Sequence, residues 1–447
     1  MPKKIFSVIL LVFIVSLSFV TPLSVSAYEP TGIDVSAKAG ILVSLDTGEF
    51  LYEKNIDQKV YPASIAKIMT AVLMLESDKY DPEGKISMTK EILDMVLGTG
   101  LAVSLLKNGD EFTQLDLLYM VLMSSFGDST YLAAQYYGGT IENFVSMMNA
   151  KAAELGLAGT HYSNPVGLHE EETYTTVRDT YTLATYALKN ETFKQICETP
   201  RYTITTSLSG KRTLSTTNFL QDTTTRYYYS YAKGVKTGFT EAAGRCLVST
   251  ASYKGYSYMC ILMGCPDSKS NRREFLDSAD LYRWAFKNFS FKEIATSTEP
   301  VCEMPVENSL ETDFVSLYFK EPFISVLPNA ANDSTIIIKP HLKGESVKAP
   351  VKKGDVLGTA EIIYAENVIG NVDLIAGDDI KASGLLVFTS YVKSIFTSIY
   401  MKVLIWLGII CVLIFIFLCI KLNLPRFKKR RARYIPYKEK QNRRHNG

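Results

Sequence analysis

The sequence is poor in the residues that bind metals or build disulfide frameworks. It holds only four histidines among 447 residues, and no Cys-x-x-Cys or His-x-x-x-His pattern accompanies its seven cysteines. A zinc site is therefore not expected. Cys411 and Cys419 lie in a long apolar run, and the other five cysteines are an odd number, so at least one thiol is free unless it pairs between molecules. We expect no metal and no disulfide framework.

Net charge is also small, but the two signs are unevenly distributed. The chain carries +2 overall, whereas residues 421–447 hold eleven Lys or Arg and a single acidic residue. Without this segment and the N-terminal lysines, residues 28–420 have a clear negative excess. The body of the protein is thus acidic, and nucleic acid is not expected as a partner.

The N-terminus has the three parts of a secretory signal peptide. Lys3 and Lys4 precede the apolar run "IFSVILLVFIVSLSFV", and the segment ends in small residues at Ala27. We therefore expect residues 1–27 to be removed on export, so that the mature chain begins at Tyr28. An uncleaved membrane anchor is the alternative.

A second apolar run lies near the C-terminus, where residues 403–420 contain no charged side chain. With its apolar flanks the run approaches the roughly 20 residues that a helix needs to cross a bilayer. A buried helix of a soluble protein is rarely apolar on every side for so long. We expect a transmembrane helix over 400–422, with the basic tail 423–447 in the cytoplasm by the positive-inside rule. A tail that binds nucleic acid is the alternative, which the adjacent span disfavours.

Hydrophobic periodicity predicts an α+β domain followed by a small all-β domain. Strand patterns at 40–52 and on both sides of the turn Lys254-Gly255 enclose a helical region. Helices are expected at residues 63–78, 114–137, 141–156, 176–188 and 274–289. Strands at both ends of such a region favour one antiparallel sheet with the helices packed around it. From 297 to 386 the helical periodicity fades, and short apolar runs alternate with turns.

Five Ser-x-x-Lys pairs occur in the chain, and one of them, Ser64 with Lys67, has the setting of a nucleophile and its base. Both residues share one helical face at the start of a segment whose continuation, "IMTAVLML", is apolar enough to bury it. Burial lowers the pKa of a lysine, and its neutral amine can then accept the proton of a serine hydroxyl. A helix N-terminus adds N–H groups suited to an oxyanion. The other four pairs lack this context; a solvated surface pair is the alternative.

The tripeptide Lys236-Thr237-Gly238 lies at an edge of the predicted C-terminal hairpin. A lysine there can bind a substrate carboxylate, threonine adds a hydrogen bond, and glycine lets a substrate backbone lie against the strand. Alone the tripeptide is a weak signal. It gains weight because it follows the serine–lysine pair within "GVKTGFTEAAGRCLVSTA".

Together these motifs resemble those of the D-alanyl-D-alanine carboxypeptidases, the low-molecular-mass penicillin-binding proteins with a serine–lysine pair. The resemblance runs from about residue 37 to 289 and rests on "YPASIAKIMTA", "HYSNPVGL" and "GVKTGFTEAAGRCLVSTA". The order of signal peptide, catalytic domain, small β domain and C-terminal anchor is also similar. The resemblance implies a penicillin-binding, β-lactamase-like transpeptidase fold and a reaction that needs no metal or organic cofactor.

The resemblance also implies three catalytic residues. Ser64 would attack the carbonyl between the two D-alanines and form an acyl-enzyme, and Lys67 would accept its proton. Ser125, in the loop "SSFGDS" between helices, would relay a proton to the departing D-alanine. Water would then hydrolyse the ester.

Substrate binding is implied for the second motif. Lys236 with Thr237 would hold the terminal carboxylate, and the N–H groups of the nucleophile and of Phe239 would form the oxyanion hole. Arg272 or Arg273 could assist at the carboxylate, but the segment that contains them does not align without a gap.

One position departs from the family pattern. The element that normally reads Ser-x-Asn is Ser125-Phe126-Gly127 here, followed by Asp128. The missing amide would ordinarily hydrogen-bond a peptide group of the substrate, and its loss is expected to cost about 1–3 kcal/mol. A catalytically weak penicillin-binding scaffold or regulator of wall assembly is therefore one alternative. A β-lactamase or transpeptidase-like acyl transferase is another, although it has no evident need for the span and the β domain.

The sequence thus predicts a membrane-anchored serine-type D-Ala-D-Ala carboxypeptidase on the outer face of the cytoplasmic membrane. Its expected partners are peptidoglycan stem peptides ending in D-Ala-D-Ala, β-lactams as acylating inhibitors, and the membrane. The predicted boundaries are 28–290 for the catalytic domain and 291–390 for the β domain.

Overall fold

The computed structural model describes residues 32–365 and 367–431. The predicted signal peptide and residues 432–447 of the predicted basic tail lie outside the described residues. The chain divides into two compact units. One comprises residues up to 294 together with 323–337 and 363–369, and the other comprises 295–322, 338–362 and the residues from 370 onward.

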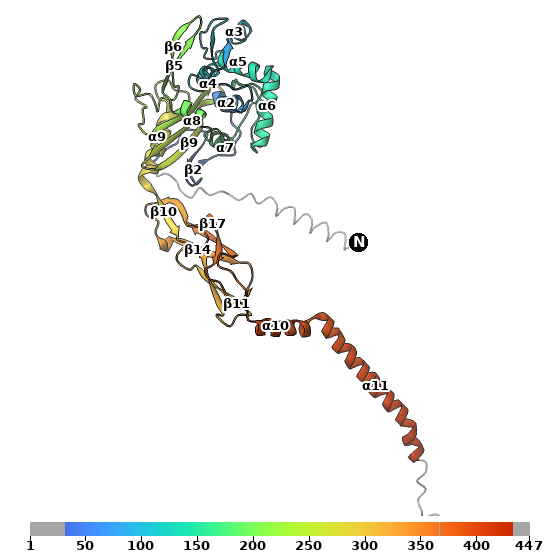
Figure 1. Ribbon diagram of the computed structural model, residues 1–447. Coiled ribbons are helices and arrows are strands. Elements are labelled where there is room, and N and C mark those ends of the chain that lie inside the picture. The colour runs from blue at the N-terminus through green and yellow to red at the C-terminus, as the bar shows by residue number, and fades with distance from the viewer. Residues whose placement is uncertain (1–31, 366, 432–447) are drawn as a thin grey trace, which may run out of the picture. The chain divides into compact units, whose positions relative to one another are not determined.

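A five-stranded antiparallel sheet is the centre of the first unit (Figure 1). Its strands, in spatial order, are β2 (Phe50–Lys54), β1 (Ala39–Ser44), β9 (Tyr256–Cys265), β8 (Gly244–Tyr253) and β7 (Ala232–Thr240). The turn between β8 and β9 places Lys254 and Gly255 at φ 51° and 86°, and Gly48 between β1 and β2 has φ 75°. Both predicted hairpins are therefore confirmed, as is the antiparallel sheet.

Both faces of this sheet are buried, because alternate residues of its strands enter two separate hydrophobic clusters. Val248 and Ile261 face the cluster formed with most of the helices. Leu247 and Leu262 face the cluster formed with helix α9 (Arg273–Asn288), which packs on β8 and β9. This layering confirms the predicted α+β class and leaves β7 as an edge strand.

The helices agree with the sequence patterns at most positions. They are α2 (Lys67–Glu76), α3 (Lys90–Met95), α4 (Gln114–Leu122), α5 (Gly127–Gly138), α6 (Ile141–Glu154), α7 (Val177–Ala187) and α8 (Glu191–Glu198). The prediction of one helix over 114–137 is wrong. The chain breaks between α4 and α5, where Ser125 takes a left-handed φ of 60° that a continuous α-helix cannot include. The apolar periodicity continues through this break, whereas the family resemblance had placed Ser125 in a loop between helices, as the structure shows. The sequence also gave no expectation for α3 and α8.

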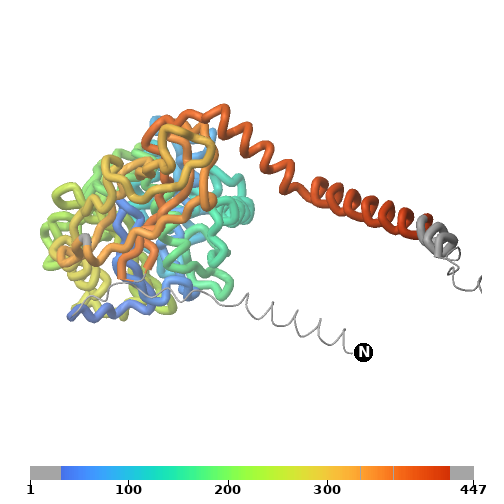
Figure 2. The backbone as a smooth tube through the Cα atoms, turned by 90° about the horizontal axis from the view of Figure 1, so that it is seen from below, coloured from blue at the N-terminus to red at the C-terminus, as the bar shows by residue number. Residues whose placement is uncertain are grey.

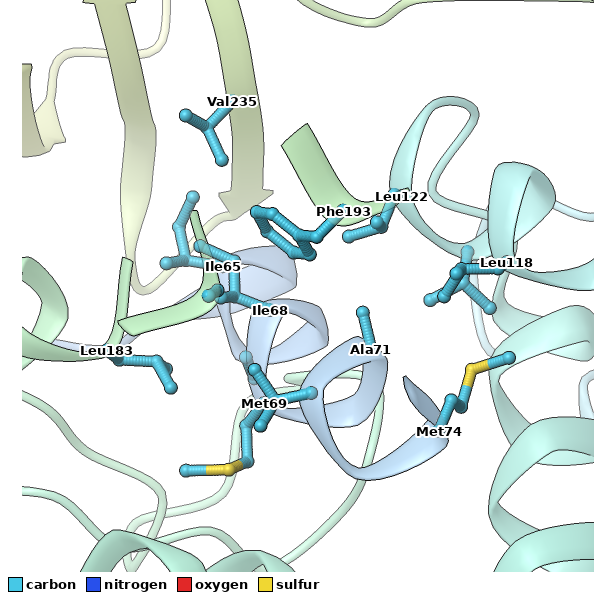
Figure 3. Close-up of a cluster of buried hydrophobic side chains, with 14 of the residues drawn as sticks. Ile65, Ile68, Met69, Ala71, Met74, Leu118, Leu122, Leu183, Phe193 and Val235 are labelled. Carbon is cyan, nitrogen blue, oxygen red and sulfur yellow. The ribbon is translucent and has the colours of Figure 1, made fainter. Parts of the chain in front are cut away.

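Helix α2 is the central helix of the first unit, and all its residues from Lys67 to Met74 are buried. Side chains of several other elements surround it (Figure 3). They include Leu118 and Leu122 of α4, Leu183 of α7, Phe193 of α8 and Val235 of β7. The apolar stretch of the sequence therefore removes the start of α2, and Lys67 with it, from water.

Smaller sheets complete the chain. Two-stranded sheets are formed by β3 (Lys85–Ser87) with β4 (Glu111–Thr113), by β5 (Arg201–Thr206) with β6 (Gly210–Ser215), and by β10 (Phe289–Ala295) with β13 (Phe323–Pro328). A six-stranded sheet has the order β14 (Ile336–Leu342), β16 (Val356–Tyr364), β17 (Asn367–Ala376), β12 (Phe314–Phe319), β11 (Cys302–Glu307) and β15 (Val347–Lys348). The predicted all-β domain after the catalytic region is thus confirmed.

Two helices follow the last strand. Helix α10 (Gly384–Thr397) and helix α11 (Ile399–Arg431) are separated only by Ser398, which takes an extended conformation (Figure 2). Within the described part of the chain, Ile399–Leu422 is the one stretch that forms a helix long and apolar enough to cross a membrane, with 24 residues and a mean hydropathy of 3.3. It coincides with the span expected from the sequence.

Candidate active site

Ser64 lies in a short 3-10 turn, η1 (Ala63–Ala66), directly before α2. The sequence placed Ser64 inside an α-helix beginning near residue 63, which the structure corrects. Ala63 has a left-handed φ of 47°, so regular α-helical hydrogen bonding starts only at Lys67. A strained residue beside a candidate nucleophile is typical of functional sites.

The segment "YSNPVGL" supports this turn from behind. Gly167 lies so close that a Cβ built on it would be 1.8 Å from the carbonyl oxygen of Ala63. Asn164 Oδ1 accepts hydrogen bonds from the backbone N–H of Gly167 (2.8 Å) and Leu168 (3.0 Å), which holds the close approach. Thr70 Oγ1 of α2 donates to the carbonyl oxygen of Pro165 at 2.9 Å. The motif therefore shapes the turn that carries Ser64.

Lys67 connects the two candidate catalytic serines. Its Nζ donates to Ser64 Oγ at 3.1 Å and to Ser125 Oγ at 3.1 Å. A third bond, to the carbonyl oxygen of Ser125 at 2.7 Å, fixes the amine. The left-handed φ of Ser125 brings both of its oxygens to the same lysine. The three predicted catalytic residues therefore form one hydrogen-bonded group, although Ser125 is 58 positions from Lys67 in the sequence.

Burial gives Lys67 the protonation behaviour of a base. Its side chain is fully buried, and this desolvation holds its pKa well below that of an ordinary lysine. The positive charge of Lys236 lowers the pKa further, while the carboxylate of Asp128 acts in the opposite direction. Burial likewise lowers the pKa of Lys236 to about 7. A neutral amine that can accept a proton from serine is therefore accessible at lower pH than in an ordinary lysine.

Strand β7 carries the second motif past the nucleophile. A Cβ built on Gly238 would lie 3.1 Å from the backbone nitrogen of Ser64, so the glycine permits a close approach of strand and turn. Thr237 Oγ1 donates to Thr217 Oγ1 at 2.6 Å. Lys236 is only 1% exposed, and its Nζ donates to the carbonyl oxygen of Thr237 at 3.1 Å. The charge of this buried lysine is close enough to Lys67 to lower the pKa of Lys67.

These elements surround a cleft of about 380 Å³. Its lining residues are Ser64, Lys67, Gly100, Leu101, Ala102, Ser124, Ser125, Thr216, Thr217, Phe219, Thr237, Gly238, Phe239, Arg245 and Arg272. Of the seven residues predicted from the motifs, Lys236 alone does not line this cleft. The motifs gave no role to Leu101, Thr217 or Arg245: the first two lie outside every motif, and Arg245 lies within "GVKTGFTEAAGRCLVSTA" without having been assigned a function.

Two arginines, each paired with a carboxylate, line the cleft. Arg245 has its guanidinium carbon 4.0 Å from the ring centre of Phe239 and pairs with Asp267 at 2.7 Å. Arg272 pairs with Glu274 at 2.5 Å and lines the same cleft. Arg273 is directed elsewhere, since it pairs with Asp277 at 2.7 Å. Of the two arginines that the sequence left open, Arg272 is the one at the cleft.

Other polar groups have structural partners. His161 Nδ1 lies 2.7 Å from the carbonyl oxygen of Glu172, and His169 packs edge-on against Tyr61 with ring centres 4.5 Å apart. All seven cysteines lie in the described ranges as free thiols. Within those ranges no group of three or more His, Cys, Asp or Glu side chains is arranged to hold a metal ion.

Comparisons with known proteins give two family matches. Residues 24–267 match the family described as D-alanyl-D-alanine carboxypeptidase, and residues 292–382 match the C-terminal domain of penicillin-binding protein 5. The chain is 30% identical over 355 residues to the D-alanyl-D-alanine carboxypeptidase DacF of Bacillus subtilis, which covers 79% of this chain and 88% of that protein. It is 28% identical over 375 residues to DacC of Escherichia coli, which covers 78% and 86%.

Among solved structures, penicillin binding protein 5 from Haemophilus influenzae has a similar fold. The TM-score is 0.62 at 24% identity, and the match covers 78% of this chain and 99% of the other. The fold implied by the sequence motifs, an α/β catalytic domain with an all-β domain after it, is confirmed by this likeness.

Proposed function

Because the chain belongs to the D-alanyl-D-alanine carboxypeptidase family, we propose that Ser64 is the residue through which this serine-type hydrolase cleaves its substrate. The observation that carries the proposal is the buried amine of Lys67, placed 3.1 Å from the hydroxyl oxygens of both Ser64 and Ser125. The family relationship favours this activity over the scaffold and the β-lactamase-like alternatives.

The substrate binds where Thr237 and the guanidinium groups of Arg245 and Arg272 line the cleft. Thr237 offers its hydroxyl to the terminal carboxylate of a peptide that ends in D-Ala-D-Ala, and Lys236 adds positive charge from below. We assign a supporting role to Arg245 and Arg272, whose guanidinium groups line the cleft. Gly238 leaves room for the peptide to lie along the edge of β7.

Acylation begins when neutral Lys67 takes the proton of the Ser64 hydroxyl. The Ser64 oxygen bonds to the carbonyl carbon between the two D-alanines, and the carbonyl electrons move to its oxygen. The backbone N–H groups of Ser64 and Phe239 receive this oxyanion; the close approach of Gly238 to Ser64 is what brings them together. No metal or organic cofactor takes part.

Collapse of this intermediate breaks the carbon–nitrogen bond. The departing D-alanine nitrogen receives a proton from Ser125 Oγ, which is replenished from the protonated amine of Lys67 at 3.1 Å. Water then attacks the Ser64 ester while Lys67 accepts a proton from it. The bond between the acyl carbon and Ser64 Oγ breaks, Lys67 returns the proton to Oγ, and the shortened stem peptide leaves as a new carboxylate after its acid proton passes to solvent. A β-lactam would acylate Ser64 in the same way.

The placement in the cell follows from the termini. We infer that the signal peptide 1–27 directs export, that domains 28–290 and 291–390 lie outside the cytoplasmic membrane, and that the span within 400–422 anchors them. The basic tail 423–447 then lies in the cytoplasm. Peptidoglycan stem peptides are thereby the accessible substrate.

Replacing the base tests this proposal. Lys67→Met should lower kcat/KM for D-alanine release from diacetyl-Lys-D-Ala-D-Ala by about a thousandfold, because no group remains to accept the serine proton. The matched control is Lys233→Met, which alters the exposed lysine of another Ser-x-x-Lys pair outside the cleft. Full activity of the Lys67 variant in a folded protein would refute the assignment.

A further inference from the structure

Residue 127 is a glycine, and Leu101 occupies the space that a side chain at this position would need. Gly127 opens α5 with a φ that is not positive, so its own backbone does not require glycine. A Cβ built on it, however, would lie 2.7 Å from Leu101 Cδ1 and 2.8 Å from Leu101 Cβ. Carbon atoms do not approach so closely. No side chain fits at 127 while Leu101 keeps its position, and the two residues therefore depend on each other.

Two consecutive residues of α5 hold the loop 97–106 that carries Leu101. The backbone N–H of Gly127 donates to the carbonyl oxygen of Ala102 at 2.7 Å. Oδ2 of the fully buried Asp128 accepts hydrogen bonds from the N–H and the hydroxyl of Ser104, at 2.8 and 2.7 Å. Charge-assisted bonds of this kind are strong when they are buried. The loop is thus fastened beside Ser125, within three residues of it.

Leu101 also belongs to the cleft. Its half-buried side chain lines the same cavity as Ser64, Lys67 and Ser125. Gly100 and Ala102, its neighbours, have no side chain larger than a methyl group. Leu101 is consequently the large apolar group on this wall, at the place where a polar amide would otherwise stand.

We propose that Leu101 is a specificity-determining residue, which selects stem peptides by an apolar contact with the residue that precedes D-Ala-D-Ala. This inference rests on the proposed function of Ser64. An amide at position 127 would offer a donor and an acceptor to a peptide group, whereas leucine offers neither and gains from contact with aliphatic carbon. Substrates with a long aliphatic side chain on the acyl side therefore gain from Leu101, and substrates without one do not.

Two peptides distinguish the proposal from a purely structural role of the loop. Leu101→Ala in the full-length protein should lower kcat/KM for diacetyl-Lys-D-Ala-D-Ala about tenfold, and for acetyl-Gly-D-Ala-D-Ala by less than about twofold. Leu105→Ala is the matched control, because Leu105 is 71% exposed on the same loop and does not line the cleft. It should change neither value. Equal loss on both peptides with Leu101→Ala, or no loss on either, would overturn the proposal.

A double-mutant cycle tests whether Leu101 and a side chain at position 127 compete for the same space. Gly127→Asn alone should reduce kcat/KM more than about tenfold, because the new amide displaces Leu101 and its loop. The pair Gly127→Asn with Leu101→Gly should regain most of the activity, and should narrow the preference between the two peptides. Wild-type activity of the single Asn variant, or no recovery in the pair, contradicts the proposal. Ser64→Ala tests the proposed function separately, since this variant should lose the D-alanine release that the wild-type protein shows.

Discussion

Replacing Lys236 by methionine should move the acid limb of the pH–rate profile to higher pH. Lys67 must be neutral to accept the Ser64 proton, so kcat/KM rises as the pH passes through the pKa of Lys67. The positive charge of Lys236 is one of the causes that hold this pKa down, after burial. Methionine preserves the length and the burial of the side chain but removes the charge. The pKa of Lys67 should therefore rise in the variant.

The size of the shift follows from electrostatics. As a general scale, two positive charges separated by about 6 Å in an effective dielectric constant of about 20 repel by about 2.8 kcal/mol. Burial lowers the pKa of Lys236 to about 7, so this lysine carries its charge for only part of the time in the relevant range. We therefore expect the acid limb to move up by about one pH unit.

The assay is kcat/KM for D-alanine release between pH 5 and about pH 9, a profile that reports the free enzyme. Binding of the substrate carboxylate will also weaken in Lys236→Met, mainly below about pH 7 where the lysine is charged. The limb is therefore also followed in kcat at saturating substrate, which does not depend on this binding. Lys151→Met is a control for the loss of a buried lysine, since Lys151 pairs with Glu76 (2.8 Å) and Glu154 (2.7 Å) away from the cleft. An unmoved limb in Lys236→Met, or one at lower pH, would refute the reasoning.

Three further expectations concern stability and location. The unfolded chain binds a proton on Lys236 up to a pKa of about 10.4, so this lysine should make the free energy of unfolding rise above pH 7 by up to about 1.4 kcal/mol per pH unit. In urea titrations Lys236→Met should remove this part of the slope, while Lys67, whose pKa is also lowered, keeps its own part. Burial alone would raise the pKa of Asp110, but hydrogen bonds, among them those from the N–H groups of Leu208 and Ser209 at 2.8 Å each, hold it below its usual value. Its stabilisation is thus present above about pH 4 and lost in acid, and Asp110→Asn should cost about 2 kcal/mol at pH 7 by the same titration. Truncation before Ile399 should move the protein from the membrane to the soluble fraction on sedimentation, and retention on the membrane would contradict the anchor.

The chemical groups of the site could be predicted because they occur in short motifs on regular elements. Ser64 and Lys67 are about one helical turn apart. The apolar stretch after them indicates that this helix is buried, and burial lowers the pKa of the lysine. The edge position of Lys236 followed from the order of strands in the sequence. In each case the signal is local, and the fold needs only to bring the motifs together.

Features that depend on a loop conformation could not be predicted. Leu101 and Gly127 are far apart in the sequence, and their mutual dependence arises because Asp128 and Ser104 fasten the loop. Read from the sequence alone, Gly127 was simply a missing amide. Hydrophobic periodicity also failed to show the break between α4 and α5, because it continues through the break while one residue changes its φ; only the family resemblance placed Ser125 in a loop.

Release of D-alanine by the full-length protein in detergent, compared with that by Ser64→Ala, tests the central claim most directly. The peptide is diacetyl-Lys-D-Ala-D-Ala, and mass spectrometry of both proteins after exposure to penicillin reports the covalent adduct. We expect steady release and one adduct on the wild-type protein, and neither on the folded variant. Release or an adduct that persists in Ser64→Ala would contradict it, as would a folded wild-type protein that releases no D-alanine.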